Sequence, residues 1–211
     1  MSVLDKIAFY QERRDEIPNQ ELARQLAETK DLAGIQEISE NLWSKNSKIQ
    51  SDCIKVLYEI GYLVPELVAP YAMDFLKLLR SRNNRLVWGA MIALSTVARI
   101  AADEIYSHLG EIRKTMERGS VITIDAGVVT LAEVAASGSE RCREIFPYLL
   151  DHLRTCRPKD VPQHAEKILI AVDKGNKDEF IRILEKRMDD MTPSQASRLR
   201  RVIKQADKKQ E

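Results

Sequence analysis

The chain has 211 residues, 44% of them hydrophobic, and its 33 basic and 32 acidic side chains give a formal net charge of +1. This balance argues against a protein whose whole surface attracts nucleic acid or anionic membrane, and 8 Gly and 7 Pro are too few for an all-β domain full of tight turns. The longest uncharged runs fall short of the roughly 18 to 20 apolar residues of a membrane helix, so no membrane partner is expected.

The three cysteines favour a cytoplasmic protein with reduced thiols. Cys53, Cys142 and Cys156 are odd in number and lack Cys-x-x-Cys spacing. Neither a disulfide framework nor a zinc knuckle is therefore indicated.

Helix-period apolar patterns, each stopped by Asn, Gly, Pro or Ser, follow one another along the chain without a convincing strand pattern between them. Residues 1–30 are predicted to form a helical cap, in which Ser2 caps a first helix and Asn19, after Pro18, caps the next. The tail at 207–211 is expected to fray. Ten further helices are predicted at residues 31–44, 48–61, 70–81, 84–101, 104–118, 121–137, 140–154, 161–173, 176–190 and 193–206.

The second helix of each predicted pair carries a shared signature of a small residue, an aliphatic residue four later and a β-branched residue three after that. The copies are Cys53/Leu57/Ile60, Ala90/Leu94/Val97, Gly127/Leu131/Val134, Ala165/Leu169/Val172 and a degenerate Ala196/Leu199/Ile203. The first four copies are spaced by 37, 37 and 38 residues, a period typical of two-helix solenoid repeats. These positions share one helix face, and the small residue predicts a close approach of the neighbouring repeat.

One segment, residues 70–97, carries a resemblance to a known family. Pro70 opens its first helix, a polar turn follows, and the second helix is rich in small residues. It resembles a HEAT repeat of the ARM-type α-solenoid family, over roughly residues 31–206, although Asn83-Asn84 replaces the usual turn Asp and Arg85 stands one place early. The resemblance implies an all-α, right-handed α-α superhelix of about five HEAT-like hairpins with an N-terminal cap, in a single domain spanning 1–211.

No catalytic, cofactor or metal constellation is indicated, so a non-enzymatic protein without cofactors is expected. His108, His152 and His164 contain no pair at i, i+4 spacing, and neither a phosphate-binding loop nor a nucleophile elbow occurs. Asp125 is expected in the first turn of its helix, where a carboxylate complements the helix dipole. Cys156 lies between two arginines, an arrangement that can depress a thiol pKa.

The two tryptophans raise the alternative of a helical-repeat DNA glycosylase, which holds a damaged base between Trp and Asp. Trp88 has no Asp near it in its own helix, and Trp43 ends a different helix. Packing in the core or along a ridge is therefore favoured for both indoles.

Charge alternates between the two kinds of predicted turn. Turns within repeats collect cations and turns between repeats collect acids, and helix dipoles explain much of this order. Arg82, Arg85 and Lys159 are the exceptions, because they lie in the turn or at the start of the second helix, where the dipole does not favour a cation. The candidate binding edge comprises Arg82, Arg85, Arg118, Arg157 and Lys159.

Two functions stay open at this point. The leading one is a protein–protein interaction or scaffold module that holds a peptide or protein segment on a concave face lined by the second helices, by analogy with other repeat folds. The alternative is nucleic-acid binding, with phosphates contacted by the basic edge.

Overall fold

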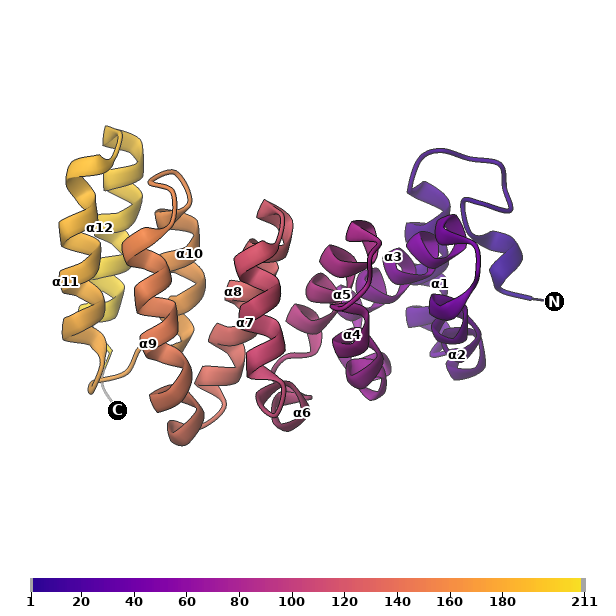
Figure 1. Ribbon diagram of the computed structural model, residues 1–211, viewed down its shortest axis with the longest axis horizontal. Helices are drawn as coiled ribbons and strands as arrows, with labels where there is room; N and C mark the ends of the chain where they lie inside the picture. Colours follow the sequence, from indigo (N-terminus) through magenta and orange to yellow (C-terminus); the bar gives the residue numbers. More distant parts are fainter. Residues whose placement is uncertain (1, 210–211) are drawn as a thin grey trace. The chain divides into compact units, whose positions relative to one another are not determined.

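The computed structural model describes residues 2–209, and within that range every regular element is an α-helix or a 3-10 turn (Figure 1). The prediction of an all-α repeat fold is confirmed. The chain divides into two compact units at Gly127–Val128, and each unit is described by itself. The single domain expected over 1–211 stays a prediction. Among the described residues, no helix combines the length and apolar content needed to cross a bilayer.

The N-terminal cap differs from its prediction at the first helix. A 3-10 turn, η1 (Leu4–Lys6), takes the place of an α-helix, and Val3 rather than Ser2 occupies the cap position. The Ser2 hydroxyl instead donates a hydrogen bond to the carboxylate of Glu37. The cap therefore begins as an irregular segment tied to the first repeat.

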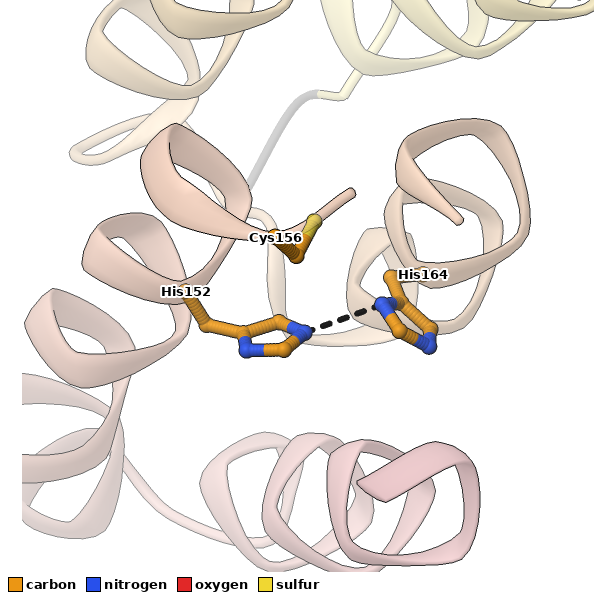
Figure 2. Close-up of side chains that lie close together, drawn as sticks. All are labelled: His152, Cys156 and His164. Atoms are coloured by element: carbon orange, nitrogen blue, oxygen red, sulfur yellow. Dashed lines mark hydrogen bonds between the residues drawn. The ribbon is translucent and has the colours of Figure 1, made fainter. Parts of the chain in front are cut away.

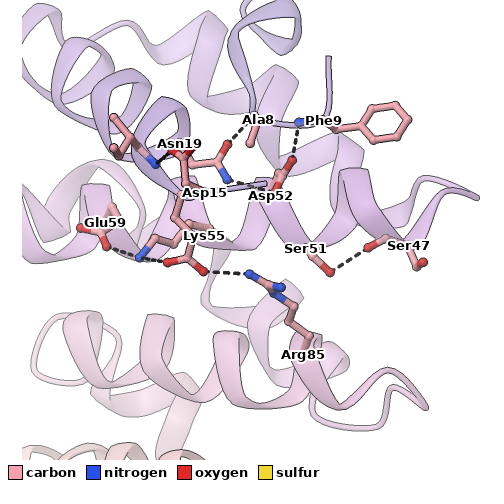
Figure 3. A network of polar contacts seen from close by, with 12 residues as sticks. Ala8, Phe9, Asp15, Asn19, Ser47, Ser51, Asp52, Lys55, Glu59 and Arg85 are labelled. Atoms are coloured by element: carbon pink, nitrogen blue, oxygen red, sulfur yellow. Dashed lines mark hydrogen bonds and ion pairs between the residues drawn. The ribbon is translucent and has the colours of Figure 1, made fainter. Parts of the chain in front are cut away.

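Asn19 was predicted to cap a helix and instead lies buried inside one, α1 (Ile17–Thr29). The helix begins earlier because Pro18 sits in its first turn, where a missing N–H leaves no hydrogen bond unmade. The Asn19 amide oxygen accepts from the Ala8 backbone at 2.9 Å, and its nitrogen donates to Asp52 at 3.0 Å. Figure 3 shows this bridge, which fixes the N-terminal segment against the next helix layer.

Helices of the N-terminal unit pair into hairpins of a first and a second helix (Figure 1). The first helices are α2 (Leu32–Glu40) with the turn η2 (Asn41–Trp43), α4 (Ala72–Leu78) after the turns η3 (Pro65–Leu67) and η4 (Ala69–Tyr71), and α7 (Leu109–Arg118) after the short helix α6 (Ala102–Tyr106). The second helices are α3 (Ser47–Leu63), α5 (Asn84–Val97) and α8 (Val121–Ala136), whose C-terminal part belongs to the other unit. Since α3 packs against both α1 and α5, these three helices form one layer.

Asparagine capping explains two of the helix starts. Asn46 accepts a hydrogen bond from the Lys48 backbone at 2.9 Å and caps α3. Asn83 does the same for Arg85 at 3.0 Å and caps α5. Asn83 thus supplies the capping oxygen that an Asp supplies in a typical HEAT turn.

The C-terminal unit contains two further hairpins. The first is α9 (Ser139–Thr155) with α10 (Val161–Ile168) and the turn η5 (Leu169–Ala171), and the second is α11 (Lys177–Arg187) and the turn η6 (Met188–Asp190) with α12 (Pro193–Asp207). Helix α9 packs on α10 and α11, and α12 packs on α10 and α11. The expected frayed tail at 207–211 begins at the last residue of α12, and its residues 210–211 lie outside the described part of the chain.

The repeat signature marks the core, with two exceptions in the C-terminal unit: Leu169 and, in the degenerate copy, Ile203 are half-buried. The Ala90 copy is wholly buried, and Leu94 has 0% exposure. Leu169 is half-buried instead, because α10 ends at Ile168 and the chain tightens into the turn η5. Ile168 takes the buried position, so the signature predicted the helix correctly and its last turn wrongly.

The closest approach between helices does not follow the small-residue prediction. A Cβ added at Gly127 would lie 2.5 Å from Met116 of α7, which is the first helix of the same hairpin. Among the glycines, Gly61 has the shortest such distance, since a Cβ there would lie 2.1 Å from Thr96 Oγ1 of the neighbouring second helix. Gly61, outside the signature, is therefore a position where the neighbouring repeat leaves no room for a Cβ.

Candidate functional site

Aromatic side chains gather on the second-helix layer of the N-terminal unit. Tyr58 and Tyr62 lie one turn apart on α3 with ring centroids 6.1 Å apart, and Trp88 of α5 lies 6.4 Å from Tyr58. Tyr62 is 61% exposed, Trp88 is half-buried and Tyr58 is 5% exposed. Rigid rings with a polar tip are typical of binding surfaces. We call Tyr58, Tyr62 and Trp88 the aromatic cluster.

Four charged side chains of the N-terminal unit form a network of ion pairs, part of which Figure 3 shows. The Lys55 ammonium lies 2.9 Å from one Glu16 oxygen and 2.6 Å from Glu59. The other Glu16 oxygen lies 2.8 Å from the Arg85 guanidinium. Glu16 therefore links a cation of α3 to a cation of α5, and we call these four residues the ion-pair network.

Both cations of the ion-pair network also contact aromatic rings. The Lys55 ammonium lies 4.8 Å from the Tyr58 centroid, and the Arg85 guanidinium carbon lies 5.9 Å from the Trp88 centroid. Distances below about 6 Å are favourable for cation–π attraction. The rings and the charges are consequently held in one arrangement before any ligand arrives.

The protonation state of Lys55 is fixed by its two carboxylates. Its burial alone would lower the pKa, but hydrogen bonds to Glu59 and Glu16 outweigh this and raise the pKa above its ordinary value. Burial likewise raises the pKa of the Tyr58 and Tyr62 hydroxyls. Lys55 is therefore charged and both phenols are neutral, and the exposed Tyr62 hydroxyl can donate a hydrogen bond to a peptide carbonyl.

A groove of 670 Å³ shares Glu16 and Arg85 with the ion-pair network. Its walls come from the N-terminal segment, the first turns of α3 and the turn before α5. Carboxylates and cations line it in equal number: Glu12, Asp15, Glu16 and Asp52, with Arg13, Arg14, Lys48 and Arg85. This mixture does not select for a uniformly charged polyanion.

The predicted basic edge is only partly available for binding in the N-terminal unit. Arg85 belongs to the ion-pair network, whereas Arg82 is exposed. Arg118 lines a second groove, of 360 Å³, together with Arg80 and Lys114. Arg80 in turn pairs with Glu111 of α7 at 3.0 Å.

The other two edge residues belong to the C-terminal unit. The Arg157 guanidinium lies 2.6 Å from Asp160, so a carboxylate neutralises it. Lys159 is exposed. A single edge running through all five cations stays a prediction, because Arg82, Arg85 and Arg118 lie in one unit and these two in the other.

Three further sequence predictions are settled by the local structure. Asp125 is the fifth residue of α8 and falls outside its first turn, so the predicted dipole role is wrong. Trp43 lies in η2, is 50% exposed and is separate from the aromatic cluster. Cys53 is fully buried as expected, and burial followed by the nearby carboxylates of Asp52 and Glu37 raises its thiol pKa.

The pKa of the Cys156 thiol is raised by burial, which contradicts the predicted effect of its sequence neighbours. The cation that opposes this rise is Arg187 of α11, not the flanking arginines. Fold contacts rather than sequence adjacency therefore determine its electrostatics.

One group of side chains was not predicted, because the helix expected at 140–154 ended before Cys156 and so left this cysteine apart from His152. His152 and Cys156 are spaced i, i+4 at the end of α9, and His164 of α10 lies beside them (Figure 2). The pattern His-x3-Cys-x7-His was the signal that could have identified the group.

No protein-family model and no curated protein sequence matches this chain. Solved structures do match. A designed armadillo repeat protein in complex with the peptide (KR)4 has a TM-score of 0.69 and 13% identity, with 89% of this chain and 86% of that chain covered. A second designed armadillo repeat protein has a TM-score of 0.67 and 11% identity, covering 97% and 98%.

An engineered protein known from a crystal structure matches over 100% of both chains, with a TM-score of 0.66 and 18% identity. All three identities are too low to transfer a ligand or a function. What the three structures share with this chain is the arrangement of stacked helical hairpins.

Proposed function

We propose that this armadillo/HEAT-type repeat protein is a non-enzymatic interaction module that binds a peptide or an extended protein segment on the second-helix layer of its N-terminal unit. We identify this layer with the concave face predicted from the sequence. The observation that carries the proposal is the aromatic cluster, held in place by the ion-pair network beside a 670 Å³ groove. A designed relative in fold forms a complex with the peptide (KR)4.

Pre-organisation is the physical reason for choosing this surface. Association loses about 0.5–1.5 kcal/mol for each flexible side chain that must be immobilised on binding. Lys55 and Arg85 are already held by Glu16, so a ligand meets side chains that have lost much of their freedom. Exposed Tyr62 and half-exposed Trp88 supply the apolar area around which binding energy concentrates in protein interfaces.

The mixed charge of the groove indicates the ligand class. A peptide backbone offers both donors and acceptors, and a segment carrying side chains of both signs can pair with carboxylates and cations alternately along the groove. We infer that the ligand is an intracellular protein segment with an aromatic or aliphatic anchor, since the odd, unpaired cysteines favour a cytoplasmic setting.

The test is selection of binding peptides from a displayed random library, followed by calorimetric measurement of their affinity. We expect Trp88→Ala to weaken the selected peptide by about 2 kcal/mol or more, because truncating a central aromatic anchor has an effect of this size. Tyr62→Ala should weaken it by about 1 kcal/mol or more.

Trp43→Ala is the matched control, since Trp43 is an exposed indole outside the aromatic cluster. It should leave affinity unchanged. Equal losses for Trp43→Ala and Trp88→Ala, or no loss for either cluster variant, would refute the proposed surface.

A second candidate, nucleic-acid binding, is favoured by one observation. The 360 Å³ groove between the α4–α5 and α7–α8 turns brings together Arg80, Lys114 and Arg118 against the single carboxylate of Glu111. Phosphate binding there would make affinity fall with salt, with a slope of about −0.7 to −0.9 per phosphate contacted.

Charge removal separates the two candidates. Replacing Arg80, Lys114 and Arg118 by Gln should abolish micromolar, salt-sensitive binding of generic DNA or RNA if this groove binds nucleic acid. Under the peptide proposal no such binding occurs at low salt. Because exposed charges contribute less than about 1 kcal/mol each, the same variant should retain most of its stability.

A further inference from the structure

A second polar group lies in the C-terminal unit and shares no residue with the peptide surface proposed above. The His152 Nε2 and His164 Nδ1 atoms are 2.9 Å apart, with ring centroids 4.8 Å apart (Figure 2). Each of His152, Cys156 and His164 offers one ligand atom, and these three atoms all lie within 4.8 Å of one another. His164 is 1% exposed, whereas His152 and Cys156 are half-buried.

We propose that His152, Cys156 and His164 bind one divalent transition-metal ion of the Zn²⁺ class. Two imidazole nitrogens and one thiolate form a borderline-soft donor set, which suits Zn²⁺ and does not suit the oxygen-seeking ions Mg²⁺ and Ca²⁺. Three protein ligands leave the fourth tetrahedral position to water. The half-buried faces of His152 and Cys156 give the ion a path to the site.

The side-chain movements required for binding are small. With Zn–N distances of about 2.0–2.1 Å and Zn–S of about 2.3 Å, neighbouring ligand atoms in a tetrahedral site lie about 3.3–3.6 Å apart. The two imidazole nitrogens, at 2.9 Å, must separate slightly, and the sulfur must approach them by about 1 Å. Cys156 follows the last residue of α9 in extended conformation, so its side chain is not constrained by a helical turn on both sides.

Metal binding would break the hydrogen bond between His152 and His164 and release a proton. In the metal-free group one imidazole carries the proton of the His152–His164 hydrogen bond. On binding, that proton leaves the ligating nitrogen and the ring is protonated on its other nitrogen instead, while the Cys156 thiol loses one proton to solvent and becomes the thiolate ligand. The ion therefore replaces one N–H···N contact and one S–H with three metal–ligand bonds.

Arg187 of the neighbouring hairpin holds the backbone that carries Cys156. Its guanidinium donates hydrogen bonds to the backbone carbonyls of Leu153 and, at 2.8 Å, Cys156. These bonds fix the end of α9 relative to α11.

The test is titration of the reduced, full-length protein with Co²⁺ as a spectroscopic probe and with Zn²⁺ by calorimetry. We expect one ion per chain, tetrahedral ligand-field absorption in the visible range and a sulfur-to-cobalt charge-transfer band. We also expect Zn²⁺ to raise the thermal unfolding midpoint, since an ion that binds only the folded state stabilises it.

Cys156→Ser should abolish the charge-transfer band. His152→Ala should lower the affinity for Zn²⁺ by about 100-fold or more, because changing a group that only hydrogen-bonds to a metal ligand already lowers metal affinity by about 10- to 100-fold. Both residues are half-buried, so these variants are expected to keep the wild-type circular-dichroism spectrum. The controls are His108→Ala and Cys142→Ser, which change a histidine and a cysteine outside the group.

The outcomes separate clearly. Loss of the band and of affinity in the two site variants, with both controls unchanged, supports the metal site. Failure of the wild-type protein to bind Zn²⁺ at micromolar concentration overturns it. Binding that survives both site variants, or that is lost equally in the controls, also overturns it.

Discussion

Gly61 offers a test of how the repeats of the N-terminal unit pack, because the same substitution elsewhere should have the opposite sign. In Gly61→Ala the new Cβ would lie 2.1 Å from Thr96 Oγ1 and 2.9 Å from Thr96 Cβ. The hydroxyl can rotate away, but the Thr96 Cβ is fixed to the backbone of α5. Helices α3 and α5 must therefore move apart locally.

Two opposing free energies decide the result. Alanine is better than glycine in a helix interior by about 0.8–1 kcal/mol, whereas overpacking a tight contact costs about 1–3 kcal/mol. We expect Gly61→Ala to destabilise by up to about 2 kcal/mol. Gly110 of α7 has open space around its Cβ direction, so Gly110→Ala should stabilise by about 0.4–1 kcal/mol.

Urea denaturation followed by far-ultraviolet circular dichroism measures both changes. Adding Thr96→Ala to Gly61→Ala removes the Thr96 Oγ1 and should restore part of the loss, giving a coupling free energy above about 0.5 kcal/mol. Equal stabilisation by Gly61→Ala and Gly110→Ala, without coupling to Thr96, would refute the close approach of α3 and α5.

Three further changes test the core, the cap and the surface. Leu94→Ala should destabilise by about 2–5 kcal/mol through lost burial and a residual cavity, and a measured loss under about 0.5 kcal/mol would contradict the repeat register. Asn19→Ala should lower the free energy of unfolding in urea by about 1–3 kcal/mol, because the buried Ala8 N–H loses its acceptor. An unchanged free energy of unfolding would mean that water replaces the amide oxygen. The hydrogen bond from Arg198 lowers the pKa of Glu166, so this pair stabilises the protein above the ordinary carboxyl pKa and ceases to do so as pH falls through the lowered value. Both side chains are partly exposed, so Glu166→Gln should lose less than about 1 kcal/mol at neutral pH and nothing in strong acid; an equal loss at both pH values would exclude the ion pair as its cause.

The repeat architecture could be predicted because it follows from the spacing of apolar and small residues within each helix. The small–aliphatic–aliphatic signature of the second helices follows helical periodicity, and residues such as Leu57 and Leu94 are indeed fully buried. Where one turn departs from α-helical geometry, as at Leu169, the periodic pattern no longer reports which residue faces the core. The close contact at Gly61 could not be predicted for a different reason, because its neighbour Thr96 lies 35 positions away in sequence.

The candidate binding surface was only partly predictable. Arg85 was identified as a cation that the helix dipole does not explain, and its partner Glu16 comes from the cap, 69 residues earlier in the chain. No sequence pattern indicates that Trp88 approaches Tyr58, because the two rings lie on different helices. Charge order along the chain thus revealed an unusual cation, but only the packing of α1, α3 and α5 revealed what surrounds it.

Fluorescence of a single tryptophan tests the central proposal most directly, because the chain contains only two. In Trp43→Phe the remaining indole is Trp88, within the aromatic cluster. Titration with a library-selected peptide should change its emission saturably, with the affinity found by calorimetry, whereas Trp88→Phe, which retains Trp43, should show no change. A response from Trp43 alone, or from neither indole while calorimetry records binding, would contradict peptide recognition on the second-helix layer.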